Sequence, residues 1–140
     1  MIKFKVVTLH GVTYEDDIDK VTIPTRSGAI TILENHAPLV SVLKPGEMTI
    51  HKGDDKIPLA VSTGIMEIRP SGEVFVMADT AERAEDIDVE RADDARKRAE
   101  ELMKQQRGTE NLDFARMQAM IEKELVRVDV GNKYRKLRIK

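Results

Sequence analysis

Four basic residues in the second half of the chain have the spacing of a polyanion-binding site. Arg91 and Arg98 are seven residues apart, which places them on nearly the same face of a helix, and Lys123 and Arg127 form an i, i+4 pair. If their two helices pair antiparallel, all four cations gather in one region and repel one another. A bound polyphosphate would relieve this repulsion through charge-assisted hydrogen bonds, and an empty site would favour separation of the helices.

The same residues also fit a purely structural interpretation. Asp88 can cap a helix, and Arg91 can pair with Asp88 or Asp94. Arg98 can simply face water. On residue types alone this interpretation comes first, because an arginine-bearing face of a helix is usually a solvated surface.

Motifs for catalysis are missing. The chain has no cysteine, no G-x-x-x-x-G-K-[ST] phosphate loop, no G-x-G-x-x-G after a strand and no G-x-S-x-G nucleophile. Its three histidines, His10, His36 and His51, lack partners at metal-ligand spacing, so we expect neither catalytic residues nor a metal site. A net charge of −2 argues against nucleic-acid binding. No run approaches the ~20 apolar residues that cross a bilayer, so we expect a soluble protein.

The first half of the chain has the pattern of short antiparallel strands. Apolar residues alternate with polar ones up to about Thr80, and glycines punctuate the runs. The alternating apolar residues are Ile2, Phe4 and Val6, then Val21 and Ile23, Ile30 and Ile32, Met48 and Ile50, and Val74 and Val76. This pattern predicts a flattened β-sandwich or barrel.

After Thr80 the apolar period changes to three or four residues, which indicates helices. Asp88 is the expected N-cap of a first helix that ends near Arg107, with Gly108 as its C-cap. Its apolar stripe is Val89, Ala92, Ala95, Ala99, Leu102 and Met103.

Asn111 is the expected cap of a second helix that ends near Val128 or Val130. Its stripe is Phe114, Met117, Met120, Ile121, Leu125 and Val128. We therefore expect an α+β protein with a β-sandwich domain over residues 1–84 and an antiparallel α-helical hairpin over residues 85–140.

Four segments in order carry a family resemblance. They are Ser27–Val40 (SGAITILENHAPLV), Leu43–Ile50 (LKPGEMTI), Ala60–Pro70 (AVSTGIMEIRP) and Val74–Ala92 (VFVMADTAERAEDIDVERA). Together they resemble the epsilon subunit of bacterial F-type ATP synthases. The resemblance implies a non-catalytic central-stalk subunit of a proton- or sodium-driven rotary enzyme, at the cytoplasmic face of the plasma membrane.

The resemblance also implies partners. The sandwich would bind the gamma subunit and sit on the c-ring, with peripheral membrane association through the complex. The hairpin would either fold down or extend along gamma towards the alpha and beta subunits and block ATP hydrolysis.

In several bacterial members ATP stabilises the folded-down hairpin by binding an I/L-D-x-x-R-A motif and further basic residues. The resemblance implies ATP as a regulatory ligand, with no cofactor required, at Glu82, Ile87, Asp88, Arg91, Ala92, Arg98, Lys123 and Arg127. Glu82 and Asp88 would lie towards the base and ribose. Lys123 stands where relatives often have arginine, and a lysine lacks the bidentate fork, so weaker binding is expected.

Two regions leave alternatives open. Ala29, Thr31 and Glu34-Asn35 replace residues usual in the family's c-ring loop, although asparagine tolerates a left-handed turn. The basic tail from Asn132 to Lys140 is a solvated end, a contact for acidic beta-subunit surfaces, or an anionic-lipid contact. Two rival functions are a β-sandwich adaptor that binds no nucleotide and an enzyme that hydrolyses nucleotide, which the missing motifs disfavour.

Overall fold

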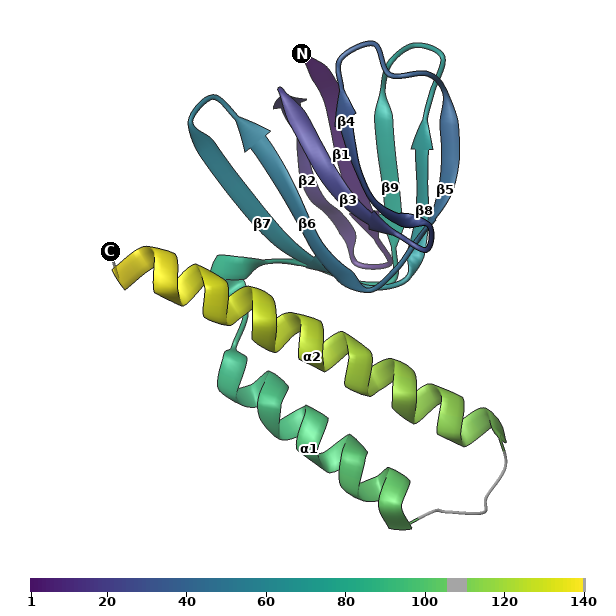
Figure 1. The fold of residues 1–140 in the computed structure, drawn as a ribbon, viewed down its shortest axis with the longest axis vertical. Coiled ribbons are helices and arrows are strands. Elements are labelled where there is room, and N and C mark those ends of the chain that lie inside the picture. The colour runs from purple at the N-terminus through teal and green to yellow at the C-terminus, as the bar shows by residue number, and fades with distance from the viewer. Residues whose placement is uncertain (106–110, 140) are drawn as a thin grey trace. The chain divides into compact units, whose positions relative to one another are not determined.

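The computed structural model of the chain divides into two compact units, Met1–Ala84 and Glu85–Lys140 (Figure 1). It describes the backbone of residues 1–105 and 111–139, and the side chains of residues 1–105 and 115–135.

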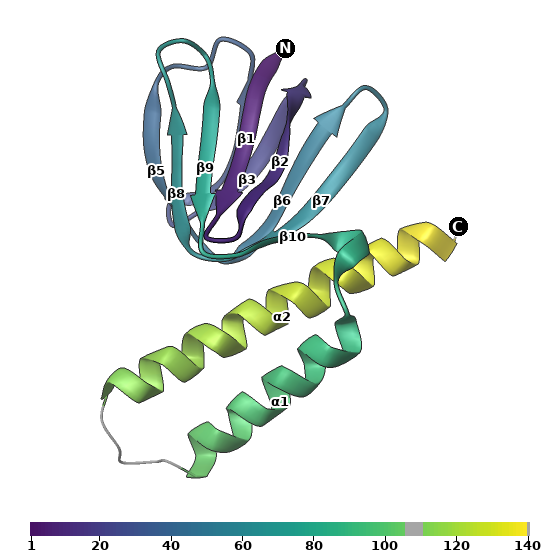
Figure 2. The same cartoon turned by 180° about the vertical axis from the view of Figure 1, so that it is seen from behind.

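The first unit is a single curled sheet of ten described strands. The strands are β1 (Ile2–Thr8), β2 (Gly11–Ile18), β3 (Lys20–Thr25), β4 (Gly28–Leu33), β5 (Leu39–Leu43), β6 (Gly46–Lys52), β7 (Asp55–Val61), β8 (Gly64–Ile68), β9 (Val74–Ala78) and β10 (Ala81–Arg83). They are ordered β10-β7-β6-β3-β5-β8-β9-β1-β2, with β4 paired to β3. The sheet folds over itself into the expected sandwich (Figures 1 and 2).

Strand pairing follows the expected antiparallel pattern with one exception. β1 and β9 pair parallel, with Phe4 opposite Val74 and Val6 opposite Val76. The other described pairs are antiparallel. A parallel pair needs a long connection, and the seven strands between β1 and β9 supply it.

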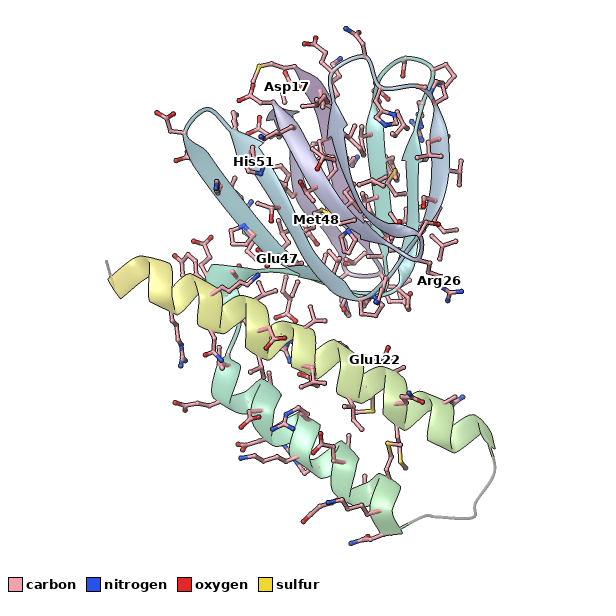
Figure 3. The ribbon with its side chains drawn as sticks, in the orientation of Figure 1. Asp17, Arg26, Glu47, Met48, His51 and Glu122 are labelled. Atoms are coloured by element: carbon pink, nitrogen blue, oxygen red, sulfur yellow. The ribbon has the colours of Figure 1, made fainter. Side chains whose placement is uncertain are left out.

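The alternating apolar residues form the core, as predicted. Phe4 is 2% exposed, and Met48, labelled in Figure 3, is fully buried. Of the alternating residues named above, all but Ile30 are buried, and Ile30 packs against the same core from a half-buried position. Because successive side chains of a strand face opposite sides, the polar residues between them face outwards.

Two backbone positions are constrained by conformation or space. Asn35 has φ 66° in the turn between β4 and β5, the left-handed region that the sequence allowed for, and His36 N–H donates to the Leu33 carbonyl at 3.2 Å. At Gly64 a Cβ atom would lie 2.1 Å from the Met77 carbonyl oxygen, so β8 and β9 meet here only because residue 64 has no side chain.

His51 on β6, labelled in Figure 3, lies in a row of basic residues that crosses three strands. It is directly opposite Lys20 on β3 and Lys56 on β7. Burial, followed by the charges of these two lysines, lowers the pKa of the imidazole below its ordinary value of 6.5.

The second unit is the predicted helical hairpin. A short 3₁₀ turn (η1, Ala84–Asp86) leads into α1 (Val89–Gln105), and α2 spans Asn111–Ile139. The expected end of the first helix near Arg107 and its C-cap Gly108 lie outside the described residues, as does the Asn111 side chain.

The predicted end of the second helix is wrong. α2 continues beyond Val130 through Gly131 to Ile139, so the backbone of the basic tail is helical as far as that residue. Glycine lowers helix stability by about 1 kcal/mol relative to alanine, but the strong helix formers after it continue the helix. Gly131 is used for packing, not for termination.

The buried stripe of the hairpin differs from the predicted one. Val89, Ala92 and Ala99 are buried as expected, but Leu102 is 46% exposed. On α2, Met120 and Leu125 are exposed by 52% and 40%, whereas the buried residues include Glu124, Val130 and Gly131. The α1 helix has 17 residues and α2 has 29, so α1 can cover only part of its partner. Phe114 lies outside the described side chains.

Candidate functional site

The start of α1 is fixed by Asp88. Its Oδ1 accepts a hydrogen bond from the Arg91 N–H at 3.1 Å, and its carbonyl accepts from the Ala92 N–H at 3.0 Å. This is N-cap geometry, in which a side-chain oxygen satisfies a backbone donor that the helix leaves unpaired. The prediction that Asp88 is the N-cap of the first helix is therefore confirmed. Its carboxylate is exposed and lies at the end of the hairpin where the basic residues were expected.

Gly131 sets the register of the two helices. A Cβ atom there would lie 2.4 Å from Val89 Cγ2 and 3.3 Å from Ile87 Cγ2. The absence of a side chain thus lets α2 contact the residues around the α1 N-terminus directly. In an antiparallel pair, each step from Val89 along α1 is matched by a step from Gly131 back along α2.

This register brings the four predicted cations to one stretch of the hairpin. If positions along the hairpin axis are counted from the contact between Gly131 and Val89, Lys123 and Arg127 on α2 lie alongside the stretch of α1 from Arg91 to Arg98. Arg91 and Arg98 are exposed, and the two residues of α2 are half-buried. The cluster therefore occupies about two helical turns, as the antiparallel arrangement predicts.

Arg91 and Arg98 on α1 differ from the neighbouring Arg96 in their ion pairing. Arg96 donates to Asp93 at 2.7 Å and to Glu100 at 2.9 Å. Its hydrogen bonds, followed by the one from Lys97, lower the pKa of Asp93. Within the described part of the chain Arg91 and Arg98 form no ion pair. Arg98 Nε donates only to the Asp94 carbonyl, at 3.4 Å.

The remaining predicted site residues have different surroundings. Ile87 is 8% exposed and Ala92 is fully buried, so both contribute packing within the hairpin. Glu82 is half-buried on β10, in the first unit, opposite Ala60 of β7. The basic residues, Asp88 and the two apolar residues thus lie in the hairpin unit, while Glu82 belongs to the sandwich.

Glu124 was not anticipated by the sequence. It is the one charged residue in the buried class among the described side chains, with 6% of its surface exposed. Its Oε2 lies 2.8 Å from Nη1 of Arg127, a predicted phosphate ligand. The signal available in the sequence was its position seven residues before Gly131, on the same helix face.

The outer face of the sandwich carries a second candidate surface. Val42 on β5 is opposite Ile65 on β8, which is opposite Met77 on β9. These side chains are 44%, 46% and 48% exposed, and Val40, on the same face of β5, is 68% exposed. We call these four residues the apolar face. A contiguous exposed apolar patch on a soluble domain is typical of a protein-binding surface.

No group of three histidine, cysteine or carboxylate residues that could hold a metal ion occurs in the described residues. None of the described helices is long and apolar enough to cross a membrane.

The chain is a two-domain protein in which a β-sandwich with an apolar outer face is followed by a helical hairpin with a basic cluster. Residues 1–84 match the family "ATP synthase, Delta/Epsilon chain, beta-sandwich domain", and residues 85–131 match "ATP synthase, Delta/Epsilon chain, long alpha-helix domain". The chain belongs to the delta/epsilon chain family of ATP synthase subunits.

Individual relatives agree with this assignment. The chain is 41% identical over 130 residues to the ATP synthase epsilon chain of Chloroflexus aggregans, and the aligned region covers 93% of this chain and 91% of the relative. It is 41% identical over 128 residues to that of Halalkalibacterium halodurans, covering 91% and 95%. A chain in the Euglena gracilis mitochondrial ATP synthase structure shares the fold, with a TM-score of 0.73 at 20% identity over 86% of this chain and 75% of that one.

Proposed function

We propose that this chain is a non-catalytic subunit of the central stalk, which couples rotation and restrains ATP hydrolysis through its hairpin. The folded hairpin binds ATP as a regulatory ligand. The observation that carries the proposal is the register set by Gly131, because it places Arg91 and Arg98 level with Lys123 and Arg127. Four cations within about two turns repel one another, and a triphosphate offsets this repulsion.

The roles of the site residues follow from their chemistry. Arg91 and Arg98 form no ion pair in the described structure and are exposed, so they can turn to phosphate oxygens without breaking an ion pair. Arg98 would give up its 3.4 Å hydrogen bond to the Asp94 carbonyl. One carboxylate oxygen of Asp88 accepts the N-cap hydrogen bond, and its second oxygen is suited to accept a hydrogen bond from a donor on the ribose or base. Lys123 would act as a point charge.

Regulation then follows from a two-state equilibrium. ATP binds the folded hairpin and shifts the population towards it, whereas the surfaces of gamma, alpha and beta bind the extended form, which blocks hydrolysis. ATP is a ligand in this scheme and is not hydrolysed by the chain. Low ATP therefore favours the inhibitory state.

Isothermal titration of the intact chain with ATP tests the nucleotide site. We expect saturable binding, and we expect Arg98→Ala to weaken it by about tenfold or more, because hydrogen bonds between charged groups are lost. Lys97→Ala is the matched control, since Lys97 is an exposed cation on the neighbouring position that pairs with Asp93 at 3.3 Å. Absence of binding at millimolar ATP, or equal weakening by both substitutions, would remove the site.

The apolar face is the proposed contact for the gamma subunit. Burying its four side chains between two proteins would remove exposed apolar area from water, at about 25 cal/mol per Å². We expect Ile65→Lys to abolish co-purification with gamma, because it places a charge at the centre of the contact. Leu9→Lys is the control, because Leu9 is 89% exposed and lies outside the apolar face. Retention of gamma by the Ile65 variant would argue against this contact.

The end of the sandwich with the β4–β5 turn is the proposed contact for the c-ring, and the complex sits at the cytoplasmic face of the plasma membrane. The basic residues of α2 are proposed to meet acidic surfaces of beta in the extended state. Deleting residues 132–140 should then raise ATP hydrolysis by the assembled enzyme, and more so at low salt, where electrostatic contacts are screened less. An unchanged hydrolysis rate would leave the tail as a solvated helix end.

A further inference from the structure

Glu124 and Arg127 form a largely buried ion pair on α2. Nη1 of Arg127 donates to Oε2 of Glu124 at 2.8 Å, and their side chains are 18% and 8% exposed. Three residues along a helix is a spacing at which side chains meet, but surface pairs of this kind keep their contact with water. Here the carboxylate has lost nearly all of it.

The buried carboxylate faces the other helix. Glu124 lies seven residues before Gly131, so the two residues are on nearly the same face of α2. Gly131 is the residue that meets Ile87 and Val89, and this face is therefore directed towards α1. By the same register Glu124 is level with the stretch of α1 between Ala92 and Ala99, which are 0% and 3% exposed. The small alanine side chains at these positions leave room for a carboxylate, which larger apolar side chains would exclude.

A charge in such a place is tolerated only with a partner. An unpaired buried carboxylate is strongly unfavourable, and removing one member of a buried pair is more damaging than replacing both by apolar groups. Arg127 supplies the partner. Since the guanidinium is engaged with Glu124 in the closed hairpin, a nucleotide phosphate that approaches Arg127 meets a carboxylate already bound there.

We propose that Glu124 is a built-in anion, which occupies Arg127 and keeps the hairpin closed in the absence of nucleotide. The part of this inference that concerns ATP rests on the proposed nucleotide site, because there Glu124 and a phosphate compete for one guanidinium. The part that concerns closure does not. A chain of this design needs less ATP to hold the folded state, so its hairpin extends less readily when ATP falls.

Closure can be measured on the intact chain by energy transfer between two dyes. The protein has no cysteine, so Lys97→Cys on α1 and Gln118→Cys on α2, both at exposed positions, give specific labelling. The variants are Glu124→Gln and a matched control, Glu122→Gln, which removes the same charge from an exposed position two residues away (Figure 3). Each is measured without nucleotide and during titration with ATP.

Without nucleotide, the parent and the Glu122 variant are expected to be closed, whereas Glu124→Gln shifts the ratio of open to closed hairpin by about tenfold or more. A double variant, Glu124→Leu with Arg127→Leu, should close again without nucleotide, because it leaves no buried charge. An equally closed Glu124→Gln hairpin, or a double variant that stays open, overturns the proposal.

Titration with ATP separates the two claims. Reclosure of the Glu124→Gln hairpin at a lower ATP concentration than the parent requires for binding supports the competition. If ATP affects none of the variants while Glu124→Gln still opens, the nucleotide site fails and the closing role of Glu124 stands. If ATP binds the parent and Glu124→Gln with equal affinity, the competition for Arg127 is refuted.

Discussion

Gly131→Ala should separate two quantities that usually change together, the stability of α2 and the closure of the hairpin. The added Cβ would lie 2.4 Å from Val89 Cγ2 and 3.3 Å from Ile87 Cγ2. Nonbonded carbon atoms pack at about 3.5–4.0 Å, so α2 and the segment at the start of α1 must move apart by more than about 1 Å at this point. Ile87 and Val89 are 8% and 7% exposed, and both would lose part of their packing.

The magnitude follows from these contacts. Inserting a methyl group into a close-packed contact costs about 1–3 kcal/mol, which corresponds to about a 5- to 150-fold increase in the ratio of open to closed hairpin. The same substitution stabilises the helix by about 1 kcal/mol, because alanine is the stronger helix former. If α2 is helical in both states, this gain does not oppose opening.

Hydrogen exchange of the α1 amides measures opening, and circular dichroism measures the helix content. We expect faster exchange in α1 with helix content unchanged or increased. Asn132→Ala is the control, because it raises helix propensity at an exposed neighbouring position with no clash. Val89→Ala in the Gly131→Ala background should restore part of the protection by removing the methyl group that clashes. Slower α1 exchange in Gly131→Ala alone would refute the packing argument.

Three further predictions concern the sandwich and the helix cap. Gly64→Ala should lower the free energy of unfolding of the sandwich by about 3 kcal/mol or more in urea titrations, because its Cβ would lie 2.1 Å from the Met77 carbonyl oxygen. A loss below about 1 kcal/mol would mean that the β8–β9 contact can relax. Asp88→Ala should destabilise α1 by about 1 kcal/mol in thermal unfolding, whereas Asp88→Asn, which keeps an acceptor for the Arg91 N–H, should lose much less. The pKa of His51 is depressed below its ordinary value of 6.5, so the unfolded state binds more protons in the pH range between the folded and unfolded pKa values. Stability therefore falls as the pH is lowered from about 6.5 towards the depressed pKa, and His51→Gln should flatten that slope in urea titrations.

The sequence by itself determined the architecture. Alternation of apolar residues predicted the strands whose side chains form the core, such as Phe4 and Met48, because a period of two specifies a half-buried strand regardless of its partners. The N-cap at Asp88 was also local information, since a side-chain oxygen needs only the backbone of the next turn. The four family segments by themselves indicated the epsilon subunit of bacterial F-type ATP synthases, which the matches to the family and to epsilon chains confirm.

Other features depended on contacts between residues distant in the sequence. Gly131 is a helix terminator by local rules, and only its contact with Val89 shows that its missing side chain is needed where two helices meet. The tertiary structure also decided that β1 pairs parallel with β9, because strand direction depends on the path of the whole chain.

For the basic cluster, too, one part could be predicted from the sequence and another part depended on the tertiary structure. Sequence spacing placed Arg91 and Arg98 on one helix face, and the pattern of the second helix grouped Lys123 with Arg127. Burial of Glu124 against Arg127 was decided by tertiary structure alone, because a charged residue in an amphipathic helix is expected to face water. Whether a side chain in such a helix is solvated depends on where the partner helix lies, and the Gly131 contact sets that position.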